Sequence, residues 1–317
     1  MSYKVLITEA VNEKGLDFLR EQGYELVMGT GPSEETLIKE CADCDGALTR
    51  NGKFSERVFE ACPKLKVVSM HGVGVDGIDV DAATARGIQI TNANDSNSTS
   101  VAEYAICMMM TMAKHLHTYA KGTKAGEKDA VRKIYGRDLA GKTLGLVGWG
   151  KIGKKVVDIA TKGLGMNVIA YSRRISEKQE TEFGCLTPDM EEVFKNSDYI
   201  SLHLPGSAAT HHMINEHLLS LMKPTAYLIN CGRGEVVEEA ALIKLLNEGK
   251  IAGAALDVVE TNLPTDDNPL LKMDNVIVTP HTAAFTTEAL ENMSYQAALG
   301  IYETLEKKPI TFPINKL

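Results

Sequence analysis

The 317-residue chain has few cysteines, no long apolar segment, and fewer basic than acidic residues. Its longest apolar stretch, residues 101–112, is too short and too interrupted by polar residues to span a bilayer. A formal net charge of −8 argues against nucleic acid as the main partner, because phosphate binding needs clustered cations. The first residues do not form a charged leader followed by an apolar core and a cleavage site. We therefore expect a cytoplasmic protein that binds neither nucleic acid nor membrane.

The six cysteines are scattered along a long chain, a distribution typical of reduced thiols. Cys41 and Cys44 form a C-x-x-C pair, but no second pair completes the four ligands of a structural zinc site. Adjacent histidines such as His211 and His212 point apart on a helix or strand, and no acidic residue is suitably spaced beside them. The sequence therefore predicts no metal site.

What the chain does contain is a regular alternation of short apolar runs with helix-like polar segments. The length suffices for two domains, and 44% apolar with 24% charged residues is typical of globular proteins. Runs rich in Val, Ile and Leu between helical segments predict an α/β fold with parallel sheets covered on both faces. The predicted strands are 5–8, 25–28, 46–49, 65–70 and 87–91, followed by 142–148, 166–172, 198–204, 226–231, 252–259 and 275–279.

Three further segments interrupt this alternation. Residues 100–122 carry a broad apolar face without an internal proline, and they predict one long helix. The polar, glycine-containing residues 122–138 predict a loop or arm, and residues 286–306 predict a C-terminal helix.

A glycine-rich turn follows the predicted strand 142–148. Gly148, Gly150 and Gly153 fit the pattern G-x-G-x-x-G, with Lys151 and Ile152 opening a plausible helix. The first glycine allows the tight turn, the second lets the backbone approach a pyrophosphate, and the third lets helix and strand pack closely. Because the helix N-terminus also faces the anion, this setting predicts dinucleotide binding.

The end of the next strand bears on which dinucleotide is preferred. A carboxylate there would bind the ribose 2′-hydroxyl and repel a 2′-phosphate. Here the strand runs instead into Ser172, Arg173 and Arg174, and guanidinium groups are suited to bidentate phosphate contacts. We expect NADP(H) to be preferred, with NAD(H) as the alternative if the arginines are only a solvated loop.

Several motifs together resemble the D-isomer-specific 2-hydroxyacid dehydrogenases, in order and over essentially the whole chain. They are HGVGVDGIDVDAATARGI (71–88), SVAEY (100–104), GKTLGLVGWGKIG (141–153), LHLP (202–205), MKPTAYLINCGRGEVV (222–237), GAALDV (253–258) and TPHTA (279–283).

The resemblance implies two doubly wound domains with a cleft between them. A flavodoxin-like substrate domain would comprise residues 1–99 plus 286–317, and a Rossmann cofactor domain would comprise residues 100–285. The family is usually dimeric through the cofactor domain and its arm, which residues 100–138 resemble. A homodimer is therefore expected.

The resemblance also assigns the reacting groups. Arg233 matches the family arginine, whose planar fork holds the 2-oxo carboxylate and polarises the carbonyl. His281 matches the acid/base histidine, which protonates the carbonyl oxygen during reduction and takes the proton back during oxidation.

Other positions match residues that line the substrate and the cofactor. Val73 and Gly74 match the loop whose backbone N–H groups face the substrate carboxylate, and Arg50 and His71 stand at loop ends of the same domain. The matches to cofactor-lining positions are Leu204, Pro205, Cys231, Arg233, Asp257, His281 and Ala284.

The sequence departs from the family at one catalytic position. A glutamate that orients the catalytic histidine normally follows the aspartate of the DV motif by five residues, and here that position is Asn262. An amide oxygen can orient an imidazole but carries no charge, whereas a carboxylate would also raise the imidazole pKa. We expect Asn262 to hold His281 and the acid/base limb of the pH profile to lie lower than in relatives with glutamate. Glu260 is the nearest alternative carboxylate.

The expected function is hydride transfer between NADP(H), or NAD(H), and C2 of a small 2-oxo or D-2-hydroxy acid such as glyoxylate or hydroxypyruvate. One alternative is a phosphoglycerate dehydrogenase-like enzyme that uses NAD. The other is a catalytically weak sensor or corepressor that binds the dinucleotide on the same scaffold, a reading that only Asn262 favours.

Overall fold

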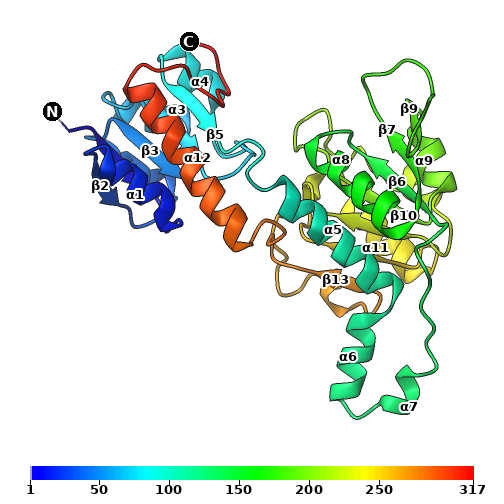
Figure 1. Cartoon of the computed structure of the whole chain (residues 1–317). Helices are drawn as coiled ribbons and strands as arrows, with labels where there is room; N and C mark the ends of the chain where they lie inside the picture. The colour runs from blue at the N-terminus through cyan, green and yellow to red at the C-terminus, as the bar shows by residue number, and fades with distance from the viewer. Residues whose placement is uncertain (1) are drawn as a thin grey trace. The chain divides into compact units, whose positions relative to one another are not determined.

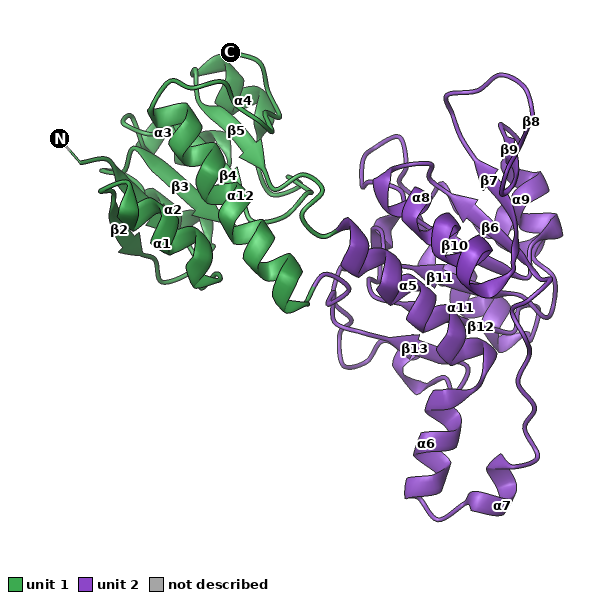
Figure 2. Cartoon of the chain, in the orientation of Figure 1, with its two compact units in different colours: residues 1–97, 285–317 green, residues 98–284 purple. Residues whose placement is uncertain are grey.

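The computed structural model describes residues 2–317, and the chain divides into two compact units (Figure 2). Unit 1 comprises Met1–Asn97 and Phe285–Leu317, and unit 2 comprises Ser98–Ala284. The division falls one or two residues before the predicted domain bounds.

Unit 1 is built on a five-stranded, wholly parallel sheet in the order β2-β1-β3-β4-β5. This is the strand order of flavodoxin-like folds. The strands of unit 1 are coloured blue to cyan in Figure 1. Its elements are β1 (Lys4–Ile7), α1 (Glu13–Glu21), β2 (Glu25–Met28), α2 (Glu34–Glu40), β3 (Gly46–Thr49), α3 (Glu56–Ala61), β4 (Val67–Met70), α4 (Val80–Ala85), β5 (Gln89–Asn92) and α12 (Thr287–Leu305).

Both faces of this sheet are covered because its strands are apolar on both sides. Helices α1 and α12 pack together on one face, where Leu16 and Leu19 of α1 meet Ile301 and Leu305 of α12. Helices α2, α3 and α4 cover the other face with a second apolar cluster. The C-terminal helix thus completes a unit whose sheet is formed by the first 97 residues.

Unit 2 contains an eight-stranded sheet in the order β13-β12-β11-β10-β6-β7-β9-β8. Counted from β6, this is the Rossmann order 3-2-1-4-5-6 with β13 added at one end and the antiparallel β8 at the other. Its elements are α5 (Ser98–Ala113), α6 (Leu116–Lys124), α7 (Lys128–Val131), β6 (Thr143–Val147), α8 (Lys151–Asp158), the π-helical turn η1 (Ile159–Gly163), β7 (Asn167–Tyr171), β8 (Gln179–Thr181), β9 (Gly184–Thr187), α9 (Met190–Asn196), β10 (Tyr199–Leu202), α10 (Glu216–Ser220), β11 (Tyr227–Asn230), the 3₁₀ turn η2 (Gly234–Val236), α11 (Glu239–Asn247), β12 (Gly253–Leu256), the 3₁₀ turn η3 (Pro269–Lys272) and β13 (Val276–Val278).

The second sheet is also buried on both faces. Helices α5 and α8 cover one face, with Leu144 and Leu146 of β6 in their apolar cluster. Helices α9, α10 and α11 cover the other face, toward which Ile200 and Leu202 of β10 point. The predicted fold class, an α/β protein with two doubly wound sheets, is confirmed.

Two elements differ from the sequence predictions. The predicted long helix 100–122 is two helices, because Arg137 donates its N–H to the carbonyl of Ala113 and His115 adopts a left-handed φ of 49°. Gly136 makes this approach possible, since a Cβ there would lie 2.8 Å from the Ala113 oxygen. The β8–β9 hairpin was not predicted. Within residues 2–317, no helix combines the length and apolar character needed to cross a membrane.

Candidate active site

In unit 2, the carboxyl ends of the parallel strands form one edge of the sheet, and the predicted site residues follow those ends. Ligands of doubly wound sheets bind at this edge, near the point where the strand order reverses. In unit 2 that point lies between β6 and β10. The residues that follow the strands are Gly148 after β6, Ser172–Arg174 after β7, Leu204 and Pro205 after β10, Cys231 and Arg233 after β11, Asp257 after β12, and His281 and Ala284 after β13.

The glycine turn connects β6 to α8, and each glycine has a distinct environment. Gly148 has a φ of +112°, and a Cβ there would lie 2.4 Å from the carbonyl oxygen of His203. A Cβ on Gly153 would lie 2.3 Å from the Gly148 oxygen. Both positions therefore exclude a side chain, as a tight turn and close helix–strand packing require.

Gly150 differs because the space in front of it is open. It is the N-cap residue of α8, and a Cβ placed there would meet no atom of residues 2–317 within 4 Å. Lys151 and Ile152 form the first helical turn with Gly153, so the N-terminal N–H groups of the helix lie beside this space. An open backbone surface at a helix N-terminus fits the pyrophosphate of a dinucleotide.

The residue between the first two glycines is held against the β8–β9 hairpin. The Trp149 and Phe183 rings are 4.8 Å apart between centroids, and the Lys154 ammonium lies 5.7 Å from the centre of the indole. These contacts connect the glycine turn to a hairpin that the sequence patterns did not reveal.

The end of β7 carries the residues expected to select the cofactor. Ser172 is buried, its N–H donates to Thr187, and its hydroxyl accepts the N–H of Arg174 at 3.3 Å. Arg173 and Arg174 are exposed. The buried serine therefore fixes the backbone from which two guanidinium groups project.

The loop that carries Arg233 is ordered by Asn230, the last residue of β11. The Asn230 side chain accepts the N–H of Gly232 at 3.0 Å and donates to the carbonyl of Arg233 at 3.0 Å. The Arg233 guanidinium donates to the Gly232 carbonyl at 3.1 Å. Gly234 lies so close to Val259 that a Cβ would be 1.7 Å from the Val259 oxygen. The arginine loop thus packs directly on the segment after β12.

Asp257 holds the turn that carries His281. Its carboxylate accepts the hydroxyl of Thr279 at 2.7 Å and the backbone N–H groups of Thr282 and Ala283 at 2.8 Å each. Its carbonyl accepts the N–H of His281 at 2.8 Å. Asp257 is buried, so this set of bonds fixes the backbone position of the histidine.

The ring of His281 is oriented by Asn262. The Oδ1 atom of Asn262 lies 2.8 Å from the Nδ1 atom of His281. Asn262 and His281 both have left-handed φ values, 70° and 54°, which asparagine and histidine adopt more readily than most residues. The amide oxygen can only accept, so Nδ1 carries a proton and Nε2 is the atom that exchanges a proton with a substrate.

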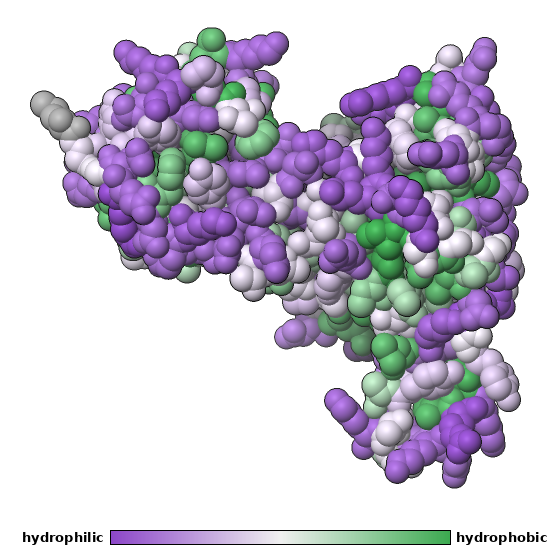
Figure 3. Space-filling model, in the orientation of Figure 1, coloured by the Kyte–Doolittle hydropathy of each residue, from purple (hydrophilic) through white to green (hydrophobic). Residues whose placement is uncertain are grey.

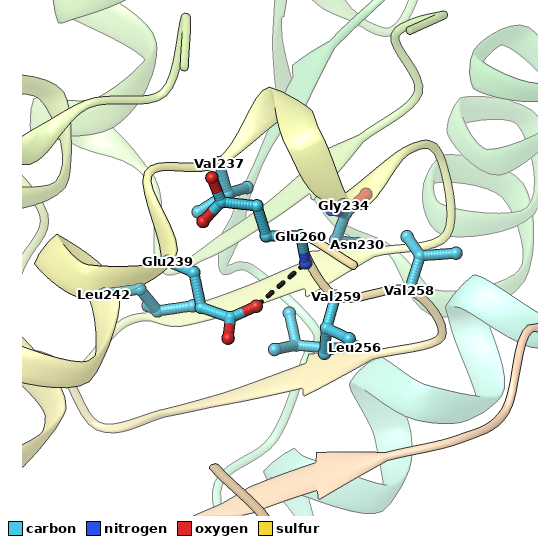
Figure 4. Close-up of a pocket in the computed structure, with 9 residues that line it drawn as sticks. All are labelled: Asn230, Gly234, Val237, Glu239, Leu242, Leu256, Val258, Val259 and Glu260. Atoms are coloured by element: carbon cyan, nitrogen blue, oxygen red, sulfur yellow. Dashed lines mark hydrogen bonds between the residues drawn. The ribbon is translucent and has the colours of Figure 1, made fainter. Parts of the chain in front are cut away.

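A small pocket lies behind these loops (Figure 4). Glu239 points toward the backbone of Glu260 and accepts its N–H at 2.8 Å, which anchors the segment that leads to Asn262. The lining residues are Asn230, Gly234, Val237, Glu239, Leu242, Leu256, Val258, Val259 and Glu260. Because most of these side chains are aliphatic, we interpret the pocket as a gap in the packing and not as a binding site for substrate or cofactor.

Unit 1 contains the residues expected to bind substrate, again after strand ends. Arg50 follows β3, and its guanidinium carbon lies 4.7 Å from the centre of the Phe285 ring. The Glu9 carboxylate accepts the N–H groups of Arg50 at 3.2 Å and Asn51 at 2.8 Å, which fixes this loop. His71 follows β4 and is buried, and neither ring nitrogen makes a hydrogen bond to another residue of 2–317. Burial, together with the charge of Arg50, lowers the pKa of His71 to about 4, so the imidazole is neutral at pH 7.

The loop after His71 presents its backbone. Gly72 has a φ of +151°, and Asn92 donates its side-chain N–H to the Val73 carbonyl at 2.7 Å. Val73 is exposed and Gly74 is partly exposed. The four predicted substrate-binding residues thus lie on two neighbouring loops at the carboxyl edge of one sheet.

Some functional neighbours escaped the sequence analysis. Asn230 holds the arginine loop and Thr279 holds the histidine loop. Both lie within motifs that the sequence analysis named, but no role was predicted for either. An asparagine that ends a strand two residues before a glycine is a signal for a side chain-to-backbone turn and would have identified Asn230. Burial, with the nearby charge of Asp257, raises the pKa of Cys231 well above the ordinary thiol value, so this cysteine is a neutral wall of the site.

Comparison with known proteins agrees with this geometry. Residues 106–283 match the family model described as the NAD binding domain of the D-isomer specific 2-hydroxyacid dehydrogenases, so a nicotinamide dinucleotide is the cofactor of this unit. The chain is similar to an NADPH-dependent glyoxylate/hydroxypyruvate reductase from Sinorhizobium meliloti, solved in complex with NADP and malonate. The TM-score is 0.88 at 29% identity, over 99% of this chain and 97% of that chain.

Two curated relatives are closer in sequence. A D-3-phosphoglycerate dehydrogenase from Methanocaldococcus jannaschii is 43% identical over 90% of this chain, but the chain spans only 54% of that protein. A glyoxylate reductase from Pyrococcus furiosus is 39% identical over 95% of this chain and 92% of the relative. The resemblance inferred from the motifs is confirmed: the chain belongs to the D-isomer-specific 2-hydroxyacid dehydrogenase family.

Proposed function

We propose that the protein reduces a small 2-oxo acid to the D-2-hydroxy acid with NADPH, and catalyses the reverse oxidation. The observation that carries this proposal is the His281 imidazole, oriented by Asn262 at the same sheet edge as the glycine turn. Arg233, presented by a neighbouring strand, is the group suited to hold the substrate carboxylate.

The chain's own residues supply the binding and the proton. The bound nicotinamide supplies or accepts the hydride at C2. During reduction the Arg233 guanidinium polarises the carbonyl, and Nε2–H of a protonated His281 donates to the carbonyl oxygen. The histidine is then neutral and keeps its remaining proton on Nδ1, which donates a hydrogen bond to Oδ1 of Asn262. One 2-oxo acid, one NADPH and one proton give one 2-hydroxy acid and one NADP⁺.

The preference for NADP(H) rests on the end of β7. The buried Ser172 takes the position where a ribose-binding carboxylate would stand, and Arg173 and Arg174 project into solvent beside it. Two exposed guanidinium groups favour a 2′-phosphate and carry no repulsive charge against it. The reductase of Sinorhizobium meliloti, which is named NADPH-dependent, supports this choice.

The substrate is proposed to be small, with glyoxylate and hydroxypyruvate as the first candidates. Arg50, His71, Val73 and Gly74 would contact its carboxylate or its C3 substituent. The 43% identity to a D-3-phosphoglycerate dehydrogenase favours the oxidation of a phosphorylated hydroxy acid as the second candidate.

The test is consumption of NADPH and of NADH, followed by absorbance, with a panel of glyoxylate, hydroxypyruvate, pyruvate and branched 2-oxo acids. Oxidation of 3-phosphoglycerate with NAD⁺ is measured in parallel. We expect turnover with NADPH to be fastest, and His281→Ala to lower kcat by about 100-fold or more. Faster turnover with NADH would contradict the cofactor preference. Cofactor binding without turnover on any substrate would favour a sensor over an enzyme.

We also propose a homodimer that forms through the arm of unit 2. Figure 3 shows apolar surface where α5 leads into α6, and Met110, Leu116 and Tyr135 are 40%, 60% and 83% exposed. Such exposed apolar side chains on a projecting arm are typical of an interface. Light scattering on a sizing column should give twice the chain mass, shifting toward the monomer in Leu116→Glu. The control Met28→Glu changes a similarly exposed side chain of unit 1 and should remain dimeric.

A further inference from the structure

Two adjacent histidines of unit 2 point the same way, although neighbouring side chains on a helix or strand diverge. The rings of His211 and His212 are stacked with centroids 4.0 Å apart and planes 28° apart. The cause is the left-handed backbone of His212, which has a φ of 48°. The N–H groups of His211 and His212 donate to Ser207 and Glu235, which hold the turn in place. Unusual backbone conformations of this kind occur preferentially at functional positions.

A carboxylate from a distant part of the chain completes the cluster. Glu260 follows β12, and its Oε1 atom lies 2.6 Å from Nε2 of His212. One nitrogen of each histidine and one Glu260 oxygen all lie within 4.8 Å of one another. The Glu260 backbone is fixed by Glu239 (Figure 4), so the carboxylate is presented from an anchored segment. Forty-eight residues separate Glu260 from His212, which is why the sequence offered no acidic partner.

We propose that His211, His212 and Glu260 bind one divalent transition-metal ion of the Zn²⁺ class. Two imidazoles and one carboxylate suit Zn²⁺, Ni²⁺ or Cu²⁺, whereas Mg²⁺ and Ca²⁺ require mostly oxygen ligands. Around a tetrahedral zinc ion, ligand atoms lie roughly 3.3 Å apart. The side chains are partly exposed, so His212 and Glu260, now 2.6 Å apart, can separate slightly while the more distant ligand atoms move closer together. Solvent would occupy the remaining coordination positions.

The location gives the site a defined relation to the proposed active site. Glu260 and Asn262 belong to one tight turn, in which the N–H of Asn262 donates to the carbonyl of Val259 at 2.7 Å. An ion bound to Glu260 would therefore link the loop after β10 to the turn that presents Asn262 to His281.

The test uses tag-free, full-length protein that has been stripped with a chelator and dialysed against Zn²⁺ or Ni²⁺. We expect one equivalent of metal per chain, and affinity lowered about tenfold or more in both His211→Ala and Glu260→Gln. The control His217→Ala removes another exposed histidine, paired with Glu191, and should bind as the wild type does. Thermal unfolding verifies that each variant is folded.

Substitution with Co²⁺ identifies the ligands independently. The visible absorption of bound Co²⁺ should lack thiolate charge-transfer bands and should be clearly weaker in Glu260→Gln at the same subsaturating Co²⁺ concentration. Absence of saturable binding would overturn the proposal. So would binding that is unchanged in both ligand variants, or a thiolate spectrum, since either would place the metal on other residues such as the cysteines.

Discussion

At the scale of single residues, the histidine of the proposed active site is oriented by an uncharged neighbour. Asn262 Oδ1 accepts from Nδ1 of His281 at 2.8 Å, so ring orientation is retained without a carboxylate. A carboxylate at the same place would favour the imidazolium, which is the form that donates a proton during reduction. We therefore expect Asn262 to affect the pH dependence of the proposed reduction and not only its rate.

The variant Asn262→Glu tests this directly. Reduction needs protonated His281, so kcat/KM falls as pH rises through the pKa of that group. A neighbouring carboxylate raises this pKa, and we expect the falling limb to move to higher pH by about one unit. The measurement is a pH profile of NADPH oxidation with the best 2-oxo acid. Asn262→Gln, which keeps an amide, is the neutral control and should leave the limb in place. If the falling limb lies at the same pH in the wild type and in Asn262→Glu, residue 262 does not influence the acid/base chemistry of His281.

The double variant Arg173→Ala/Arg174→Ala tests the residues after β7. If the two arginines bind the 2′-phosphate, the variant loses their charge-assisted hydrogen bonds to it. The KM for NADPH should then rise about tenfold or more. The KM for NADH should stay the same, because NADH lacks that phosphate. Lys178→Ala is a suitable control, since this nearby lysine is already paired with Glu192. An unchanged KM for NADPH would show that the two arginines form only a solvated loop.

Residues near each other in a motif were easier to assign from sequence than residues joined only by the fold. The spacing from Asp257 identified Asn262 as the position that faces His281. Asp257 was predicted only as a cofactor-lining residue, and the structure shows a second role for it, because both its carboxylate oxygens bind the turn 279–283. His212 and Glu260 could not be connected, since their contact depends on two loops that meet only in the folded chain.

At the scale of elements, the strand–turn–helix unit β6–α8 contains glycines with two different roles. Gly153 is needed for packing, whereas Gly150 is expected to face the cofactor. A Cβ on Gly153 would lie 2.3 Å from a backbone oxygen, whereas a Cβ on Gly150 meets open space. The two substitutions to alanine therefore make a matched pair within one turn.

Gly150→Ala should weaken cofactor binding without destabilising the fold. The added methyl group would stand where the backbone is expected to approach the pyrophosphate, and we expect the Kd for NADPH to rise about tenfold or more. Gly153→Ala should instead lower stability by about 1–3 kcal/mol through overpacking. Calorimetric titration and thermal unfolding distinguish these effects. Unchanged NADPH affinity in Gly150→Ala would contradict the proposed position of the dinucleotide.

Elements were predicted from sequence where apolar patterns are local and strong. The buried parallel strands are continuous apolar runs, so all eleven predicted strand segments overlap observed strands. The β8–β9 hairpin was missed because Gln179–Thr181 is polar and pairs only at the sheet edge. The break between α5 and α6 was missed because it depends on Arg137, which returns from the far side of the arm.

At the scale of the whole molecule, the two units differ in how the chain builds them. Unit 2 is one continuous segment, and both faces of its sheet are covered by its own helices. Unit 1 needs two segments, since Ala297, Ile301 and Leu305 of α12 belong to the core formed with β1 and α1. Burial of Ile301 and Leu305 contributes about 1.5–3 kcal/mol each, so the first 97 residues alone lack a large part of their core.

Residues 98–284 produced alone should therefore fold and bind NADPH, whereas residues 1–97 produced alone should not fold. The isolated unit 2 contains the glycine turn, Arg173, Arg174 and the turn that holds His281, but it lacks Arg50 and His71. We expect cooperative thermal unfolding and a Kd for NADPH within about tenfold of the full chain, with no measurable reduction of 2-oxo acids. Residues 1–97 joined by a flexible linker to 285–317 are the matched control and should regain cooperative unfolding. Turnover by residues 98–284 alone would show that unit 1 contributes nothing essential to substrate binding. Failure of this segment to fold would show that unit 2 depends on unit 1 for its stability.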